Sequence, residues 1–347
     1  MSPGDEQDLR SEQPLWPLLL FGLSLASVGF YLAFRPAPDP PRQQDEFGIE
    51  PQYLVDEKGL APTDPGEPVS LAYGPDGDRR LAFEMRQRNE SRAGTLRTRL
   101  AFILSERLRS PDDGSNENGE STSPAAEEAA VAMEWDFDRV AVSVREGEGE
   151  GEVGRDIVDQ VDRLLAGTNQ LRTFDRIGVP LSADWTSVTN PQVRETLALL
   201  RHAQTLLLPR LPRGRVNAGE SWVYQLKYDR PDLAGDGRMR GTVDVETVYR
   251  GNITVGDGRE LAVLRRRFSI DGVFRADDGQ GAQTRVELEG TGAGTALFEP
   301  SMGRVVESRM TLDRTITRSD ADSEDADVGA PGGTGRVELY LGERSAP

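Results

Sequence analysis

Residues 306–316 read VESRMTLDRTI, and this stretch decides the fold class. Apolar side chains stand at Val306, Met310, Leu312 and Ile316, and every odd-numbered position between them is polar. Successive side chains of a β-strand point to opposite faces of a sheet, so a period of two predicts a strand with one buried face. The stretch therefore predicts a β-sheet that has one face on a hydrophobic core and the other in water.

The same alternation recurs elsewhere in the chain. It is present in residues 96–104, 133–144, 243–246, 285–289 and 337–341. Between Phe137 and Val140 the apolar positions change from odd to even numbers, and a β-bulge near Arg139 would restore the pattern. Strands in this number, joined by hairpin-length loops, predict a curved antiparallel sheet or half-open barrel.

Two other segments have helical spacing. Residues 157–165 place apolar side chains three or four positions apart before Gly167. Asn190-Pro191 is a good helix start ahead of an apolar stripe that Pro209 closes. The sequence thus predicts a mainly β (α+β) fold with two helices, the second at 191–208, on the apolar side of the sheet.

The composition excludes several common chemistries. The chain has 59 acidic and 41 basic residues and a formal charge of −18, so we expect no nucleic-acid partner. It has no cysteine, its only lysines are Lys58 and Lys227, and its only histidine is His202. These counts exclude disulfides, a phosphate-binding loop that ends in Gly-Lys-Ser/Thr, and a zinc site built on two histidines. We expect no enzymatic activity, no cofactor and no metal site.

The N-terminal region predicts a membrane anchor. Residues 14–34 contain no charged side chain and are long enough to cross a bilayer as a helix, after an acidic tail at 1–13. A cleaved signal peptide is the alternative, but the tail lacks the positive charge that such peptides carry. Arg10 lies before the span and Arg35 and Arg42 lie after it, so the charges do not decide the orientation. Residues 35–68 are rich in proline and acids, which predicts a disordered linker.

The remaining residues, 69–345, are predicted to form the β-rich domain. Its two halves, about 69–180 and 211–345, share a faint pattern. Leu81–Arg86 and Trp222–Lys227 each open a series of strands, and Phe174–Val179 and Phe298–Val305 each place an aromatic-acid pair before a glycine turn. Two degenerate repeats joined by the helix at 191–208 would explain the pattern, and so would ordinary hairpin chemistry.

The segment between these halves carries a resemblance. Residues 211–222 read LPRGRVNAGESW, and the Leu-Pro pair, the valine and the Gly-Glu-Ser-Trp that leads into a strand resemble a motif of a bacterial family of β-rich envelope proteins. The resemblance covers residues 66–345. It implies a curved antiparallel sheet outside the cytoplasm and supplies no biochemical role. Members often carry a lipidated cysteine, which this chain replaces with its apolar N-terminal segment.

Four arginines are the candidate binding residues. Arg97 and Arg99 lie on the polar face of their strand, where they would bind phosphate or an acidic glycan, or pair with the protein's own acids. Arg266 and Arg314 share the strand phase of their apolar neighbours, so both are predicted to point inward. Because an unpaired buried charge is costly, each must meet a buried acid, follow a bulge or line a wet cavity that holds an amphiphile.

Two residues of types used in catalysis have simpler explanations. His202 shares the side of Arg194 and Glu195 and is predicted to face water. Ser221 lacks the second glycine of a nucleophile elbow. We therefore expect a membrane-anchored, non-enzymatic envelope protein that binds or carries an apolar or amphiphilic ligand. The alternative is a structural or assembly partner of another envelope protein.

Overall fold

The computed structural model describes residues 67–74, 77–91, 94–110, 131–146, 169–186, 203–231, 238–277, 283–320 and 330–344. Within these ranges the strands are β1 (Val69–Ser70), β2 (Gly77–Ser91), β3 (Gly94–Arg109), β4 (Val131–Glu146), β5 (Asn169–Phe174), β6 (Pro180–Thr186), β7 (Arg215–Val216), β8 (Ser221–Pro231), β9 (Arg238–Thr254), β10 (Glu260–Asp277), β11 (Gln283–Glu299), β12 (Arg304–Asp320) and β13 (Ala330–Glu343).

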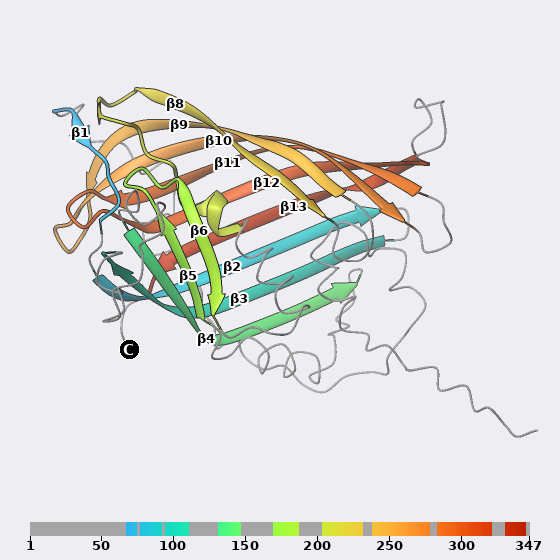
Figure 1. Cartoon of the computed structure of the whole chain (residues 1–347), viewed down its shortest axis with the longest axis horizontal. Coiled ribbons are helices and arrows are strands. Elements are labelled where there is room, and N and C mark those ends of the chain that lie inside the picture. The colour runs from blue at the N-terminus through green and yellow to red at the C-terminus, as the bar shows by residue number, and fades with distance from the viewer. Residues whose placement is uncertain are drawn as a thin grey trace, which may run out of the picture.

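One large antiparallel sheet dominates the fold. Its eleven strands follow the order β6-β5-β4-β3-β2-β13-β12-β11-β10-β9-β8, and β1 pairs with β7 in a separate two-stranded sheet. The order ends at β6 and β8, which do not pair with each other, so the sheet is not closed. Figure 1 shows the long strands curving, with β5 and β6 wrapped in front of them. The predicted mainly β fold with a curved antiparallel sheet is confirmed.

Alternation places the core on one face of this sheet, here called the inner face. On β12, Met310 and Leu312 are buried, while Arg309 and Asp313 are exposed. Most of the buried apolar side chains of β2, β3, β4, β10, β11 and β13 join the same cluster. Burying this much apolar surface is the dominant favourable contribution to folding.

Five register shifts interrupt the described strand pairs, and two of them bear on the sequence predictions. Ile103 pairs with Arg139 and Leu104 with Phe137, so Asp138 is the extra residue on β4. This confirms the bulge predicted near Arg139.

The second bulge corrects one expectation. Phe298 pairs with Val305 and Leu297 with Glu307, so Val306 is the extra residue on β12. Val305 joins the main core, whereas Val306 packs with Leu297 in a second small cluster. The prediction that Val306 shares a face with Met310 is therefore wrong, because the extra residue changes the phase at the start of the strand.

Tyr73 lies just after β1. It contacts the ends of β5 and β11, the turn after β5 and the segment before β7. The Tyr73 ring lies 5.4 Å from the ring of Phe174 and 5.4 Å from the ring of Phe298, measured between centroids. Its amide donates to the carbonyl of Arg176, and its hydroxyl donates to the carbonyl of Pro209 at 2.9 Å. These contacts fasten the segment before β2 and the segment before β7 to the inner face.

The expected helices are not supported. Helical geometry in the described ranges is confined to residues 203–207, the only described part of the helix predicted at 191–208. The helix predicted at 157–165, the tail at 1–13, the span at 14–34 and all but the end of the linker at 35–68 lie outside the described residues. None of the helical residues that the structure describes forms a segment long and apolar enough to cross a membrane.

Both predicted halves of the domain contribute to one sheet. Strands β2–β6 come from the first half and β8–β13 from the second, and the pairing of β13 with β2 joins them. The aromatic-acid motifs lie at the ends of β5 and β11, each the fourth strand in its run, β2–β5 and β8–β11. The phenylalanine of each motif packs against Tyr73. Duplication stays a prediction.

Candidate functional site

Arg266, on β10, is buried on the inner face with 1 % of its surface exposed. It forms no ion pair with any acid among the residues that the structure describes. Its guanidinium donates to the carbonyl of Leu206 at 2.5 Å and to the hydroxyl of Ser308 at 2.7 Å, and Ser308 donates to the carbonyl of Leu207 at 2.8 Å. A cation suits the carbonyl end of a helical turn, where it meets partial negative charge. Arg266 therefore fastens residues 203–207 to the sheet.

Arg314, on β12, has a different environment. It lies in a row of residues that are in register across five strands: Ile270, Gly290, Arg314, Gly335 and Asn89. Both of its cross-strand neighbours are glycines, so no side chain stands beside it on the inner face. Its guanidinium crosses Gly335 and donates to Asn89 Oδ1 at 2.9 Å.

The Arg314 guanidinium is only partly compensated. Its Nε atom is buried without a hydrogen-bond partner, and none of the described carboxylates forms an ion pair with it. Burial lowers the pKa of Arg314 to about 10, because the apolar surroundings disfavour the charged form. The side chain remains a cation at neutral pH and lies among the apolar residues Leu312 and Ile316 of its own strand.

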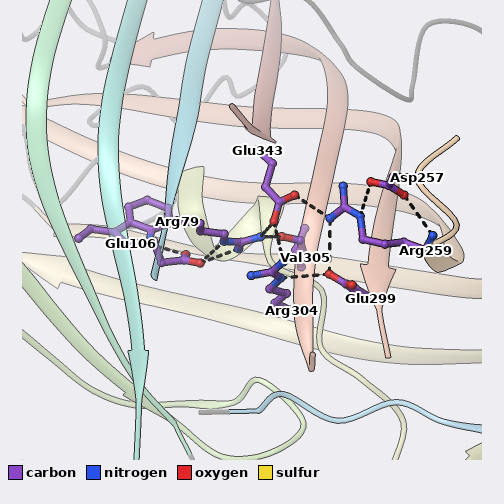
Figure 2. Close-up of polar contacts among 9 residues, drawn as sticks. Arg79, Glu106, Asp257, Arg259, Glu299, Arg304, Val305 and Glu343 are labelled. Carbon is purple, nitrogen blue, oxygen red and sulfur yellow. Dashed lines mark hydrogen bonds and ion pairs between the residues drawn. The ribbon is translucent and has the colours of Figure 1, made fainter. Parts of the chain in front are cut away.

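A second group of charges, the rim cluster, lies at one end of the sheet. It consists of three arginines and three glutamates: Arg79, Arg259, Arg304, Glu106, Glu299 and Glu343. Figure 2 shows Glu343 between the three arginines. One of its oxygens lies 3.3 Å from Arg79 and 3.2 Å from Arg304, and the other lies 2.8 Å from Arg259.

The rim cluster holds strands together. Arg79 on β2 contacts Glu106 on β3 at 2.6 Å and also donates to the carbonyl of Val305 on β12. The neighbouring Trp135 on β4 donates to Glu106 at 2.7 Å. Burial alone would raise the pKa of Glu343, but the hydrogen bond from Arg259 and the charges of Arg79 and Arg304 lower it on balance. Such a carboxylate stays ionised near neutral pH and cannot serve as a general acid.

Arg97 and Arg99, the predicted anion-binding arginines, lie on the outer face of the sheet, opposite the inner face. Arg97 is exposed, and Arg99 pairs with Glu84 at 2.5 Å. Arg97 lies in register with Arg88 of β2, and Arg88 with Arg336 of β13. Arg88 contacts Glu90 at 2.6 Å, and Arg336 contacts Asp313 at 2.7 Å. Apart from Arg97, the arginines of this row are paired with acids, which favours the internal-pairing interpretation over an anion site.

A hollow of about 680 Å³ is lined by outer-face residues, among them Arg88 and Arg336, and also by Arg314 and its register neighbours Ile270, Gly290 and Gly335. Most side chains around it are hydroxyls and charges of both signs. Ile270 is the one apolar side chain among the residues that line it, so the hollow alone does not suit an acyl chain. The hollow beside Tyr73 and Arg172 is only about 10 Å³, because the inner segments fill that end of the sheet.

The motif that carries the family resemblance has structural roles here. Gly219 has a φ of 91°, which glycine adopts without strain, and its amide donates to the carbonyl of Tyr249 at 2.7 Å. Trp222 is partly buried and donates to the carbonyl of Arg210 at 2.8 Å. Ser221 is exposed at the start of β8, and His202 lies outside the described residues.

Sequence analysis missed the rim cluster and the partner of Arg314. Asn89 lies 225 residues from Arg314, and Glu343 lies 264 residues from Arg79. The sequence does contain one signal for the surroundings of Arg314. Glycines at every second position of β11, Gly290, Gly292 and Gly294, mark a strip of the inner face without side chains. No protein-family model matches the chain, and a search of curated proteins finds no match.

Proposed function

We propose that the chain is a membrane-anchored, non-enzymatic envelope protein whose half-open barrel binds an amphiphilic ligand. The observation that carries the proposal is the inner face of the unclosed sheet. Its apolar surface continues from the filled end, near Phe298, to Ile270 and Ile316 toward the other end of the strands. An apolar concave surface with a few polar groups is the usual character of a site for a lipid-like ligand.

The location of a ligand follows from how the inner face is filled. Near Tyr73 the inner segments occupy the space down to about 10 Å³, so a ligand has no room there. Toward the other end, the glycines of β11 leave a strip of inner face without side chains. We place the ligand on this second part, against β10, β11 and β12.

The anchoring and the envelope location rest on the sequence. The apolar span at 14–34 and the proline-rich linker at 35–68 would hold the β-rich domain close to a bilayer, from which an amphiphile can be taken. Resistance of the full chain to carbonate extraction from membranes tests the anchor. Recovery of the mature chain in the soluble fraction, cut after the span, would contradict it.

Native mass spectrometry of the freshly purified full chain tests the binding function. We expect adducts with the masses of lipids that persist after the detergent has been stripped away. A chain without adducts, which also shows no saturable binding of a fluorescent acyl probe after delipidation, would overturn the proposal. A stoichiometric protein partner in place of lipid would favour the second candidate.

That second candidate is a structural or assembly role through a sheet edge. β8 ends the sheet, and one of its sides carries no described strand partner. Val223, near its start, is 71 % exposed. An edge strand of 11 residues with an exposed apolar side chain is a template for pairing with another chain.

A further inference from the structure

Arg314 is a cation on the inner face whose position the fold does not explain. The Nε atoms of Arg266 and Arg314 are both buried without a partner, but Arg266 also has two oxygen partners and fastens a helical turn, whereas Asn89 is the one hydrogen-bond partner of Arg314 in the described part of the chain. Arg314 connects none of the described inner segments to the sheet. Burial of the Arg314 guanidinium therefore costs free energy, and Arg314 does not hold a helical turn in place as Arg266 does.

Glycines on the two neighbouring strands leave the room that the Arg314 and Asn89 side chains occupy. A Cβ atom on Gly335 would lie 2.7 Å from Asn89 Oδ1 and 3.1 Å from Arg314 Nε, so both polar groups lie directly above this glycine. On the other side, a Cβ on Gly290 would lie 3.3 Å from Arg314 Cβ and 2.8 Å from the carbonyl of Asp313. Any larger residue at either position would displace the polar pair or the strand.

The donors of this pair match an oxyanion. Arg314 has a buried Nε–H without a partner, and the Asn89 amide nitrogen donates to no group in the described part of the chain. Guanidinium and amide donors on two side chains in contact suit a carboxylate or phosphate, which accepts several hydrogen bonds at once. The side chains next to the pair, Ile270, Leu312 and Ile316, are apolar and suit an alkyl chain.

We propose that Arg314 and Asn89 form the head-group site for an amphiphile with an anionic oxygen head group, whose alkyl chain lies along the inner face. The inference rests on the proposed function and narrows its ligand class to carboxylates and phosphates. Neutral amphiphiles of equal chain length bind more weakly, because they leave the buried charge uncompensated. The carboxylate and the phosphate share this chemistry, and the experiment separates them.

Photolabelling of the full chain in phosphatidylcholine nanodiscs tests the proposal. The probes are a diazirine-labelled fatty acid, the matching fatty alcohol and a phosphatidic acid with the same labelled chain. Sites of labelling are mapped by mass spectrometry to peptides of β10–β12. We expect saturable labelling there by one or both anionic probes, at concentrations about tenfold or more below those needed for the alcohol, as expected for a charge-assisted hydrogen bond.

Variants separate the head-group site from the acyl site. Arg314→Leu should remove the preference for anions while labelling by the alcohol persists, and Arg314→Lys should keep part of the preference. Arg309→Leu is the matched control, because it removes an exposed arginine of the same strand on the outer face. Asn89→Leu serves as a second variant if Arg314→Leu does not fold.

The outcomes distinguish the two proposals. Equal saturable labelling by acid and alcohol in the wild type, or an anion preference that survives Arg314→Leu, overturns the head-group site and leaves amphiphile binding in place. Absence of saturable labelling of β10–β12 by all three probes overturns the proposed function itself. Preference for phosphatidic acid over the fatty acid assigns the phosphate as the head group.

Discussion

The Arg266 guanidinium donates a hydrogen bond of 2.5 Å to the carbonyl oxygen of Leu206, sixty residues earlier in the chain. This bond ties the helical turn at 203–207 to β10, the third strand from the β8 end of the sheet. It also explains how a charge can lie inside a hydrophobic core without an acid. The carbonyl at the end of the turn and the Ser308 hydroxyl supply the negative ends of dipoles that an acid would otherwise provide.

Replacement of Arg266 should destabilise the fold. Arg266→Leu leaves the Leu206 carbonyl and the Ser308 hydroxyl without their donor, and we expect a loss of about 2 to 4 kcal/mol in the free energy of unfolding. Urea denaturation followed by tryptophan fluorescence, with the buried Trp135 as a reporter, measures it. The control is Arg267→Leu, whose side chain is 84 % exposed and should change stability by about 0.5 kcal/mol or less. Equal effects of the two variants would contradict the role assigned to Arg266.

Glu343 should make stability depend on pH in the acid range. The pKa of Glu343 is lower in the folded protein than its ordinary value of 4.5, so the unfolded state takes up the proton first as the pH falls. The stabilisation is therefore complete above about pH 4.5 and is lost as the pH falls through the folded-state pKa. Urea unfolding of the wild type and Glu343→Gln at a series of pH values should show a stability difference that shrinks below this point. A difference that stays constant with pH would show that the rim cluster does not hold Glu343 ionised.

The glycines of β11 should tolerate no added methyl group. A Cβ on Gly294 would lie 2.5 Å from the carbonyl of Arg309 and 2.8 Å from the Cβ of Met310, both on the paired strand β12. Gly294→Ala should therefore cost about 1 to 3 kcal/mol through overpacking, seen as a lower urea midpoint. Gly256→Ala is the control, since a Cβ there meets nothing within 4 Å. If both variants unfold at the wild-type midpoint, the close approach of β11 and β12 is not required.

The β8 edge can be tested in cells with a photo-crosslinking amino acid. Placed at Val223, it should give adducts with another protein if β8 pairs with a partner, because this side chain is exposed at the sheet edge. Placed at Thr291, an exposed position on β11, which is paired on both sides, it should give none from strand pairing. Val223→Lys should abolish the adducts of a crosslinker placed at Gln225 while leaving the free energy of unfolding within about 0.5 kcal/mol of wild type. If a crosslinker at position 223 gives no protein adducts, the proposed assembly role of the β8 edge is contradicted.

The strands were accessible from the sequence because alternation is local. The pleat of a strand fixes which of Met310 and Thr311 faces the core, whatever the rest of the chain does. A phase change within one strand is local too, which is why the bulge at Asp138 could be predicted. The bulge at Val306 could not be predicted in the same way. Val306 is apolar, so it fits the alternation of the residues that follow it and leaves no visible break in the pattern.

The amino-acid sequence by itself determined a mainly β domain, the inward phase of Arg266 and Arg314, and the absence of thiol chemistry. Only the tertiary structure decided what each arginine meets. Arg266 contacts the end of a helical turn, Arg314 contacts Asn89 across a glycine, and Arg79 contacts glutamates on both neighbouring strands, β3 and β13. The reason is physical: the pleat acts over two residues, whereas strand order and register bring together side chains separated by hundreds, and periodicity along the chain carries no information about those pairings.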